Sequence, residues 1–233
     1  MKNKNKSASP ACAACDSEIP QRLCMTEKGK PGKGCPTLTQ QEVLDEANQE
    51  YKIKAVQEFA NKASLQEAEC YANRDQTPYV MQPSKTRIVE TCEFAMKMGY
   101  KTIGLAFCLG LSQEAKVVEE ILRGYGFEVV SICCKAGKTP KELIGLTDDE
   151  KVYKGTDESM CNPIFQAKAL NTRAVDFNIL LGLCVGHDSL FFQYSDIPTT
   201  VLAVKDRVTG HNPLVPIYQS GAYYKKIRFP DIE

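Results

Sequence analysis

The fold is decided by residues 177–194, which read FNILLGLCVGHDSLFFQY. The first seven residues form an apolar run that predicts a strand buried on both faces. A Cys-Val-Gly-His loop follows, and Asp188 then caps a short helix through Tyr194. A buried strand followed directly by a helix is the repeating unit of α/β proteins, in which parallel strands are covered by helices.

The same unit recurs on both sides of this stretch. Upstream, the pattern predicts a helix over 84–99, a strand over 101–107, a helix over 112–124 and a strand over 127–132. Asn162–Pro163 begins a further helix, and residues 199–204 form the last strand. Right-handed crossovers then give an α/β domain over 84–233, with a doubly wound, mostly parallel sheet of Rossmann-like or flavodoxin-like layout. The pattern does not specify the order of the strands.

Residues before this domain have a different composition. Residues 1–10 are rich in Lys, Asn and Ser and predict a disordered tail. Residues 11–37 hold four cysteines among Gly, Pro and Lys, with too few apolar residues for a core of their own. Residues 38–83 form a helical segment, broken by prolines near its end.

Composition limits the classes of function. The chain has 233 residues and a formal net charge of zero, which does not favour a nucleic-acid partner. No apolar run is long enough to span a bilayer and no signal peptide is recognisable, so we expect a cytoplasmic protein without membrane contact. Eleven cysteines are unusual in a reducing compartment, where they favour metal binding or redox chemistry over disulfides.

The N-terminal cysteines follow a C-x2-C-x8-C-x10-C spacing, formed by Cys12, Cys15, Cys24 and Cys35. A C-x2-C pair can place two thiolates on one ion, and two further thiolates complete a tetrahedron. Four thiolates also hold Fe–S clusters, and Cys35–Pro36 resembles the Cys-Pro ending of many cluster motifs. We therefore predict a metal centre here, with zinc and an Fe–S cluster equally favoured.

A second group of reactive residues follows the predicted strands. The carboxyl ends of parallel strands meet at one edge of a sheet, where ligands bind in doubly wound folds. We predict a ligand site or second metal site there, with Cys184, His187, Asp206 and His211 as catalytic candidates. The cofactor-binding candidates are Cys108, Cys133, Cys134, Cys161 and Arg207. Both histidines of the chain belong to this group, and the helix N-terminus at His187 favours a neutral imidazole.

Three stretches resemble a known family: Cys161–Pro163, Gly182–Phe191 and Val204–Pro213. Together with the N-terminal cysteine motif, they are similar to the prokaryotic family labelled domain of unknown function 1847. Members of that family are described as metal-binding proteins, common in anaerobic bacteria and archaea, without an assigned reaction. The resemblance implies metal binding and a reducing cytoplasm, and it supplies no catalytic roles.

Three functions remain open. The first is a binding or redox protein with an N-terminal Fe–S cluster or zinc and a small molecule or redox partner at the strand ends. The second is a zinc-stabilised enzyme in which Cys184 or Cys161 is the nucleophile and His187 or His211 the base. The third is a non-catalytic adaptor whose cysteine module binds a partner protein. The oligomeric state is not specified by any pattern.

Overall fold

The computed structural model describes residues 9–231. The predicted disordered tail, except for residues 9 and 10, lies outside the described residues. The chain divides into two compact units, Met1–Leu65 and Gln66–Glu233. Within the described residues, no helix has both the length and the apolar character that crossing a membrane requires.

The first unit is mostly helical after its cysteine-rich start. Helix α1 spans Pro36–Thr39, α2 spans Gln41–Glu50, and α3 begins at Lys54 and continues to Glu69 in the second unit. Helix α2 buries none of its residues, and α3 buries only Gln66. The helical segment predicted from composition is therefore divided into three helices with little packed core of their own.

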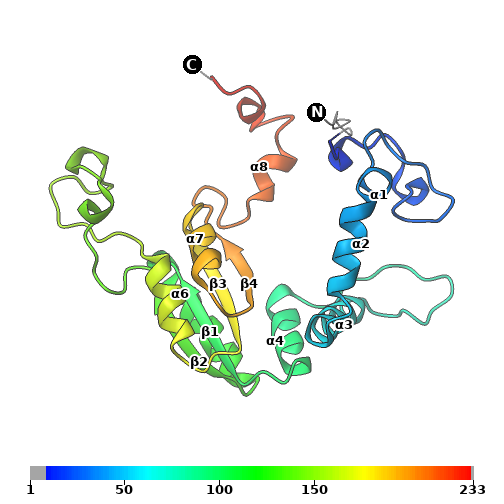
Figure 1. Cartoon of the computed structure of the whole chain (residues 1–233). Helices are drawn as coiled ribbons and strands as arrows, with labels where there is room; N and C mark the ends of the chain where they lie inside the picture. The colour runs from blue at the N-terminus through cyan, green and yellow to red at the C-terminus, as the bar shows by residue number, and fades with distance from the viewer. Residues whose placement is uncertain (1–8, 232–233) are drawn as a thin grey trace, which may run out of the picture. The chain divides into compact units, whose positions relative to one another are not determined.

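A four-stranded sheet forms the centre of the second unit (Figure 1). Its strands are β1 (Thr102–Phe107), β2 (Glu128–Cys133), β3 (Phe177–Leu183) and β4 (Thr199–Val204). They are all parallel, in the order β2-β1-β3-β4. The predicted doubly wound α/β fold is confirmed, and the strand order is the flavodoxin-like one, in which the chain changes direction between β1 and β3.

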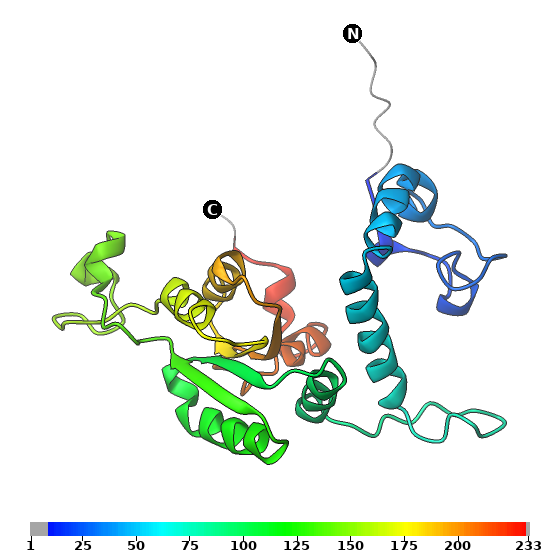
Figure 2. The ribbon, with the colours of Figure 1, turned by 60° about the horizontal axis from the view of Figure 1, so that its bottom comes forward.

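Helices cover both faces of this sheet (Figure 2). Helix α5 (Ser112–Gly124) packs on β1 and β2, while α6 (Pro163–Asn171) and α7 (His187–Tyr194) lie on the other face. Helix α4 (Arg87–Lys97) precedes β1, and the short α8 (Leu214–Tyr218) follows β4. All seven residues of β3 are buried, as expected for a central strand covered on both faces.

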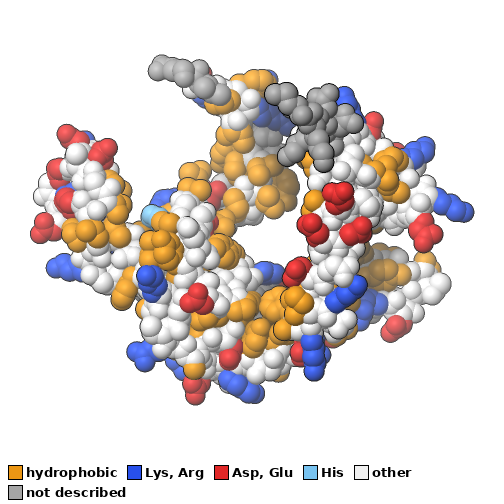
Figure 3. Space-filling view, in the orientation of Figure 1, with side chains coloured by type: hydrophobic (Ala, Val, Ile, Leu, Met, Phe, Trp, Pro, Cys, Tyr) orange, Lys and Arg blue, Asp and Glu red, His pale blue; other side chains and the backbone are white. Residues whose placement is uncertain are grey.

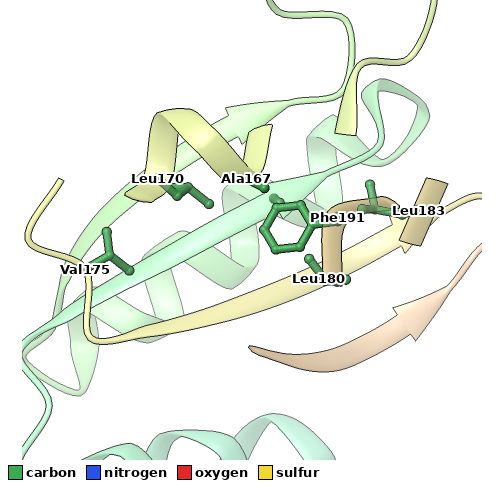
Figure 4. Packing of buried hydrophobic residues seen from close by; sticks show 7 residues of the cluster. Ala167, Leu170, Val175, Leu180, Leu183 and Phe191 are labelled. Carbon is green, nitrogen blue, oxygen red and sulfur yellow. The ribbon is translucent and has the colours of Figure 1, made fainter. Parts of the chain in front are cut away.

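The core beneath α6 and α7 is built around Phe191, whose side chain is fully buried. Figure 4 shows its ring among Leu180, Leu183 and Ala167. Leu170 and Val175 extend the same cluster. This packing joins the strand end at Leu183 to the helix that begins at His187, so the loop between them is supported by a dense core.

One glycine in β3 changes the direction of the strand end. Gly182 has a φ of +68°, and the register between β3 and β4 shifts on both sides of Leu181. A residue with positive φ inside a strand produces a bulge, which redirects the side chains that follow it. Cys184 comes two residues after this bulge.

Residues 135–160 leave the sheet as a lobe (Figure 1, left) and then return to it. Acidic side chains gather on this lobe in Figure 3, and its lysines pair with them, Lys141 with Glu158 at 2.8 Å and Lys151 with Glu142 at 2.5 Å. The N–H of Asn162 donates to the carbonyl of Cys134 at 2.8 Å where the lobe closes. This bond places Cys161 beside the end of β2.

Candidate functional site

The predicted strand-end residues lie where the flavodoxin-like order changes direction. Cys108 directly follows β1, and Cys184 directly follows β3. Cys134 follows β2, and Cys161 stands just before α6, whose N-cap Asn162 accepts a hydrogen bond from the N–H of Phe165. One pocket, with no space left for a water molecule, is lined by Cys108, Cys134, Cys161, Gln166, Leu183, Cys184 and His187. Ligands of doubly wound proteins bind at this position in the sheet.

Cys134 lies at the centre of the thiols. Its Sγ is 3.6 Å from the Sγ of Cys161, and it accepts the backbone N–H of Leu109 at 3.3 Å. Its side chain is buried, whereas those of Cys108 and Cys161 are partly exposed. Hydrogen bonds to Cys108 and Cys161 both raise the pKa of Cys134, and burial raises it further. Cys134 is therefore the neutral thiol of the group.

The two neighbours of Cys134 shift in the opposite direction. The contact with the Cys134 thiol, followed by the contact with His187, lowers the pKa of Cys161 to about 4. The same Cys134 thiol, with the backbone of Gly110 and with Lys205, lowers the pKa of Cys108 to about 5. Thiolates are the nucleophilic form of cysteine, so a lowered pKa favours reactivity at Cys161 and Cys108 over Cys134.

His187 lies beside Cys161, and this contact changes the pKa of its imidazole. The hydrogen bond to Cys161 raises the pKa of His187. The helix N-terminus alone disfavours the imidazolium, but a thiolate in direct contact outweighs that partial charge. The neutral imidazole expected from the helix position stays a prediction, and the contact with Cys161 shifts the His187 pKa toward the imidazolium form.

Cations surround the thiols. Arg207 donates from Nη2 to the Sγ of Cys184 at 3.2 Å, and this contact raises the pKa of the guanidinium. Lys205, the residue after β4, contacts Cys108, and the charge of Lys135 acts on Cys161. Glu158 lies 4.0 Å from Lys135, so Arg207 and Lys205 are the cations directed at the thiols.

Two of the predicted catalytic residues shape the loop after β4. Asp206 accepts the backbone N–H groups of Val208 and Thr209 at 3.0 and 3.1 Å through Oδ1. Nδ1 of His211 accepts the N–H of Asp206 at 3.1 Å, and His211 itself has a φ of +69°. The structure places both side chains in the turn that presents Arg207, and neither lines the thiol pocket.

Cys133 also stands apart from the pocket. It is the last residue of β2, and its Sγ accepts the N–H of Lys135 at 3.4 Å. Successive residues of a strand point to opposite faces, which separates Cys133 from Cys134.

Gln166 is a site residue that the sequence did not reveal. Its side chain is fully buried and lines the pocket, and its Nε2 donates to the carbonyls of Phe107 and Ile132 at 3.2 and 2.8 Å. Among the described residues, its Oε1 has no hydrogen-bond partner. A buried unpartnered acceptor is costly and indicates an available position for a donor. No signal marked it, because a glutamine in a short helix usually faces solvent.

The four N-terminal cysteines line a different cavity, of about 120 Å³, within the first unit. Cys12 and Cys24 are exposed, and Cys15 and Cys35 are partly buried. A Cβ at Gly32 would come within 2.9 Å of the Sγ of Cys15, so only glycine leaves this sulfur free. Arg22 closes the loop with donations to the carbonyls of Ser17 and Cys15 at 2.9 and 3.4 Å.

Neither group of cysteines has the geometry of a formed metal site. Across residues 9–231, no three Cys, His, Asp or Glu side chains are arranged to hold a metal ion. Binding of an ion by either group would require the sulfurs to move closer together.

Comparison with known proteins gives one family and one close relative. The model of the family described as protein of unknown function (DUF1847) matches residues 35–202, which include the pocket-lining residues and Cys35. An uncharacterised protein of Methanocaldococcus jannaschii is 40% identical over 215 residues, which cover 92% of this chain and 96% of the relative. No solved structure matches. The chain belongs to the family described as protein of unknown function (DUF1847).

Proposed function

We propose that the strand-end pocket is a thiol-dependent active site in which Cys161 is the nucleophile. The observation that carries this proposal is the contact of Cys161 with both His187 and Cys134 in one pocket at the carboxyl edge of the sheet. A half-exposed thiolate stabilised by an imidazolium is the arrangement that activates cysteine in many thiol enzymes. Of the two nucleophiles considered from sequence, Cys161 is favoured over Cys184 because only Cys161 is paired with a histidine.

Each neighbour of the thiolate has a role in such a reaction. His187 holds the Cys161 thiolate and can return a proton to a leaving group. Arg207 and Lys205 attract an anionic substrate and orient it above the pocket. The substrate class that fits these groups is a small anionic electrophile.

The test is the pH dependence of alkylation of Cys161 by iodoacetamide, with the modified cysteine identified by peptide mass spectrometry. The alkylation midpoint of the wild-type protein is expected near pH 4. His187→Ala removes the imidazolium and is expected to raise this midpoint by at least about one pH unit, equivalent to about 1.4 kcal/mol.

His211→Ala is the matched control, because it removes the other histidine without touching the pocket. It is expected to leave the midpoint unchanged. An unchanged midpoint after His187→Ala would show that the thiolate is not held by the histidine, and the proposal would then be wrong.

A second candidate function, metal binding by the first unit, is supported by the cavity that all four N-terminal cysteines line. Cys12, Cys15, Cys24 and Cys35 supply four thiolates, the donor set of both structural zinc and Fe–S clusters. Lys30 and Lys33, which also line the cavity, offset the thiolate charge. Bound zinc would stabilise this segment, whereas a cluster would supply electron transfer.

Metal and acid-labile sulfide analysis of protein purified without oxygen tests this second function. We expect stoichiometric zinc, or iron with sulfide and absorbance near 400 nm, and we expect both to be lost in a Cys12→Ser/Cys15→Ser variant. Metal retained by that variant would place the ion elsewhere and would contradict the assignment.

A further inference from the structure

Cys134 and Cys161 are arranged as a dithiol pair. Their Sγ atoms lie 3.6 Å apart, and a disulfide requires a separation of about 2.05 Å. The hydrogen bond from Asn162 N to Cys134 O at 2.8 Å ties the two backbone segments together. The two sulfurs are therefore held next to each other, and disulfide formation requires them to approach by roughly 1.5 Å.

In thiol–disulfide exchange, an attacking cysteine meets the substrate and a resolving cysteine then displaces it. Cys161 and Cys134 differ in exposure in the way that these two roles require. Cys161 is partly exposed and can meet a substrate, whereas Cys134 is 3% exposed and can react only with a group already in the pocket. Cys108, which is also partly exposed, is a second hydrogen-bond partner of Cys134. Cys134 is therefore the buried member of the three thiols, with two partly exposed partners.

We propose that Cys161 and Cys134 are a redox-active pair that reduces a small anionic disulfide. This inference rests on the proposed thiol function and specifies its substrate class. A disulfide fits because its sulfur needs to approach only the exposed thiolate, and the pocket itself has no space for a larger group. The anionic character follows from Lys205 and Arg207 beside the thiols.

The exchange proceeds in two balanced steps. The Cys161 thiolate attacks one sulfur of the disulfide R–S–S–R, which forms a Cys161–S–S–R mixed disulfide and releases one R–S⁻. Cys134 then loses its proton to solvent and attacks the Cys161 sulfur, which releases the second R–S⁻. The substrate gains two electrons, and the protein retains a Cys134–Cys161 disulfide. A dithiol reductant from outside the protein returns the pair to the reduced state.

The test uses dithiobis(nitrobenzoate), a coloured aromatic disulfide with a carboxylate on each ring, added below stoichiometry to the full-length reduced protein near pH 6. The wild-type protein is expected to release two equivalents of thiolate for each disulfide consumed at this site. Peptide mapping is expected to find Cys134 linked to Cys161. Cys134→Ser is expected to release one equivalent and to retain the mixed disulfide on Cys161.

Cys133→Ser is the matched control, since Cys133 is the adjacent residue and does not line the pocket. It is expected to behave as the wild type. Mapping of the wild-type protein requires no variant, so the inference is testable even if Cys134→Ser fails to fold. If the wild-type protein keeps the mixed disulfide on Cys161 and forms no Cys134–Cys161 disulfide, the inference is wrong. The proposal that Cys161 is the nucleophile would still stand.

Two other outcomes would also overturn the inference. An unreactive Cys161 would remove both this inference and the proposed function. Stoichiometric zinc or iron that is released only when Cys161 is modified would identify the pocket as a metal site instead of a dithiol.

Discussion

The two cysteine clusters of this protein share their chemistry and differ in their framework. The N-terminal four lie on loops of a segment in which no residue from Cys12 to Thr39 is buried. The strand-end cysteines extend from a parallel sheet whose central strand is fully buried. The first cluster surrounds an open cavity, and the second fills its pocket with its own side chains.

This difference in framework suits the two cysteine clusters to different chemistry. A loop cluster with little core gains stability when an ion draws its ligands together, so metal binding at the N-terminal cysteines, as proposed, would be coupled to folding. A cluster on a rigid sheet can instead hold thiols at defined distances and move their pKa values apart, as between Cys134 and Cys161. Pre-positioned groups of this kind are what nucleophilic chemistry requires.

The largest expected effect comes from removing the core below the pocket. Phe191→Ala should lower the free energy of unfolding of the second unit by about 3–5 kcal/mol, because it leaves a cavity beneath α6 and α7. Urea denaturation followed by circular dichroism measures this change. Metal content at the N-terminal cysteines should not change.

Phe192→Ala is the control on the same helix, since Phe192 is 46% exposed and should cost less than about 1 kcal/mol. Equal losses in the two variants would mean that the pocket does not depend on the packing around Phe191.

The pH response of the pocket is the next largest effect. Between pH 8 and pH 6, the alkylation rate of Cys161 should change by less than about twofold, because its pKa is about 4 and the thiolate persists throughout. A free peptide thiol with a pKa of about 8.5 should slow by nearly a hundredfold over the same range. Mass spectrometry of both alkylated products in one reaction mixture makes the comparison.

Cys92 provides an internal reference of the opposite kind. It is fully buried, and desolvation raises its pKa to about 11. It should be alkylated only after the protein unfolds. Similar rates at Cys161 and Cys92 in the native protein would contradict the contrast between reactive and structural cysteines.

A smaller effect tests the bulge that redirects Cys184. Gly182→Ala should be destabilising by roughly 1 kcal/mol for the left-handed backbone and by a further 1–3 kcal/mol because the new Cβ would overlap Leu111 Cδ1. Gly186→Ala shares the positive φ but meets nothing within 4 Å, so it should show only the first part. Thermal unfolding of the two variants separates the cost of backbone strain from the cost of the overlap with Leu111. Equal losses of stability in the two variants would contradict the predicted overlap.

The smallest expected effect lies in the N-terminal cavity. Gly32→Ala would place a Cβ within 2.9 Å of Cys15 Sγ, so the retained metal should fall while the free energy of unfolding of the second unit changes by less than about 0.5 kcal/mol. Metal analysis after dialysis against a chelator measures the retention. Gly124→Ala, which meets no atom within 4 Å, is the control. Undiminished metal in Gly32→Ala would argue that Cys15 is not a ligand.

Local sequence signals placed most of the elements correctly. The strands β3 and β4 and the start of α6 match the predicted bounds, since continuous apolar runs and the Asn162–Pro163 cap are local signals. The breaks at residue 40 and at residues 51–53 were less visible, because neither proline nor glycine marks them. The site was predicted in part, since Cys108, Cys134, Cys161, Cys184 and His187 share a pocket, while the roles assigned to Asp206 and His211 stay predictions.

The sequence by itself determined the alternation of strands and helices and, through it, the presence of thiols at one edge of the sheet. Every loop after a parallel strand emerges at that edge, whatever the strand order. Only the tertiary structure decided that β1 and β3 are neighbours, that His187 meets Cys161, and that Gln166 lines the pocket of the thiols. These are contacts between residues far apart in the chain, and long-range packing, which local periodicity does not encode, creates them.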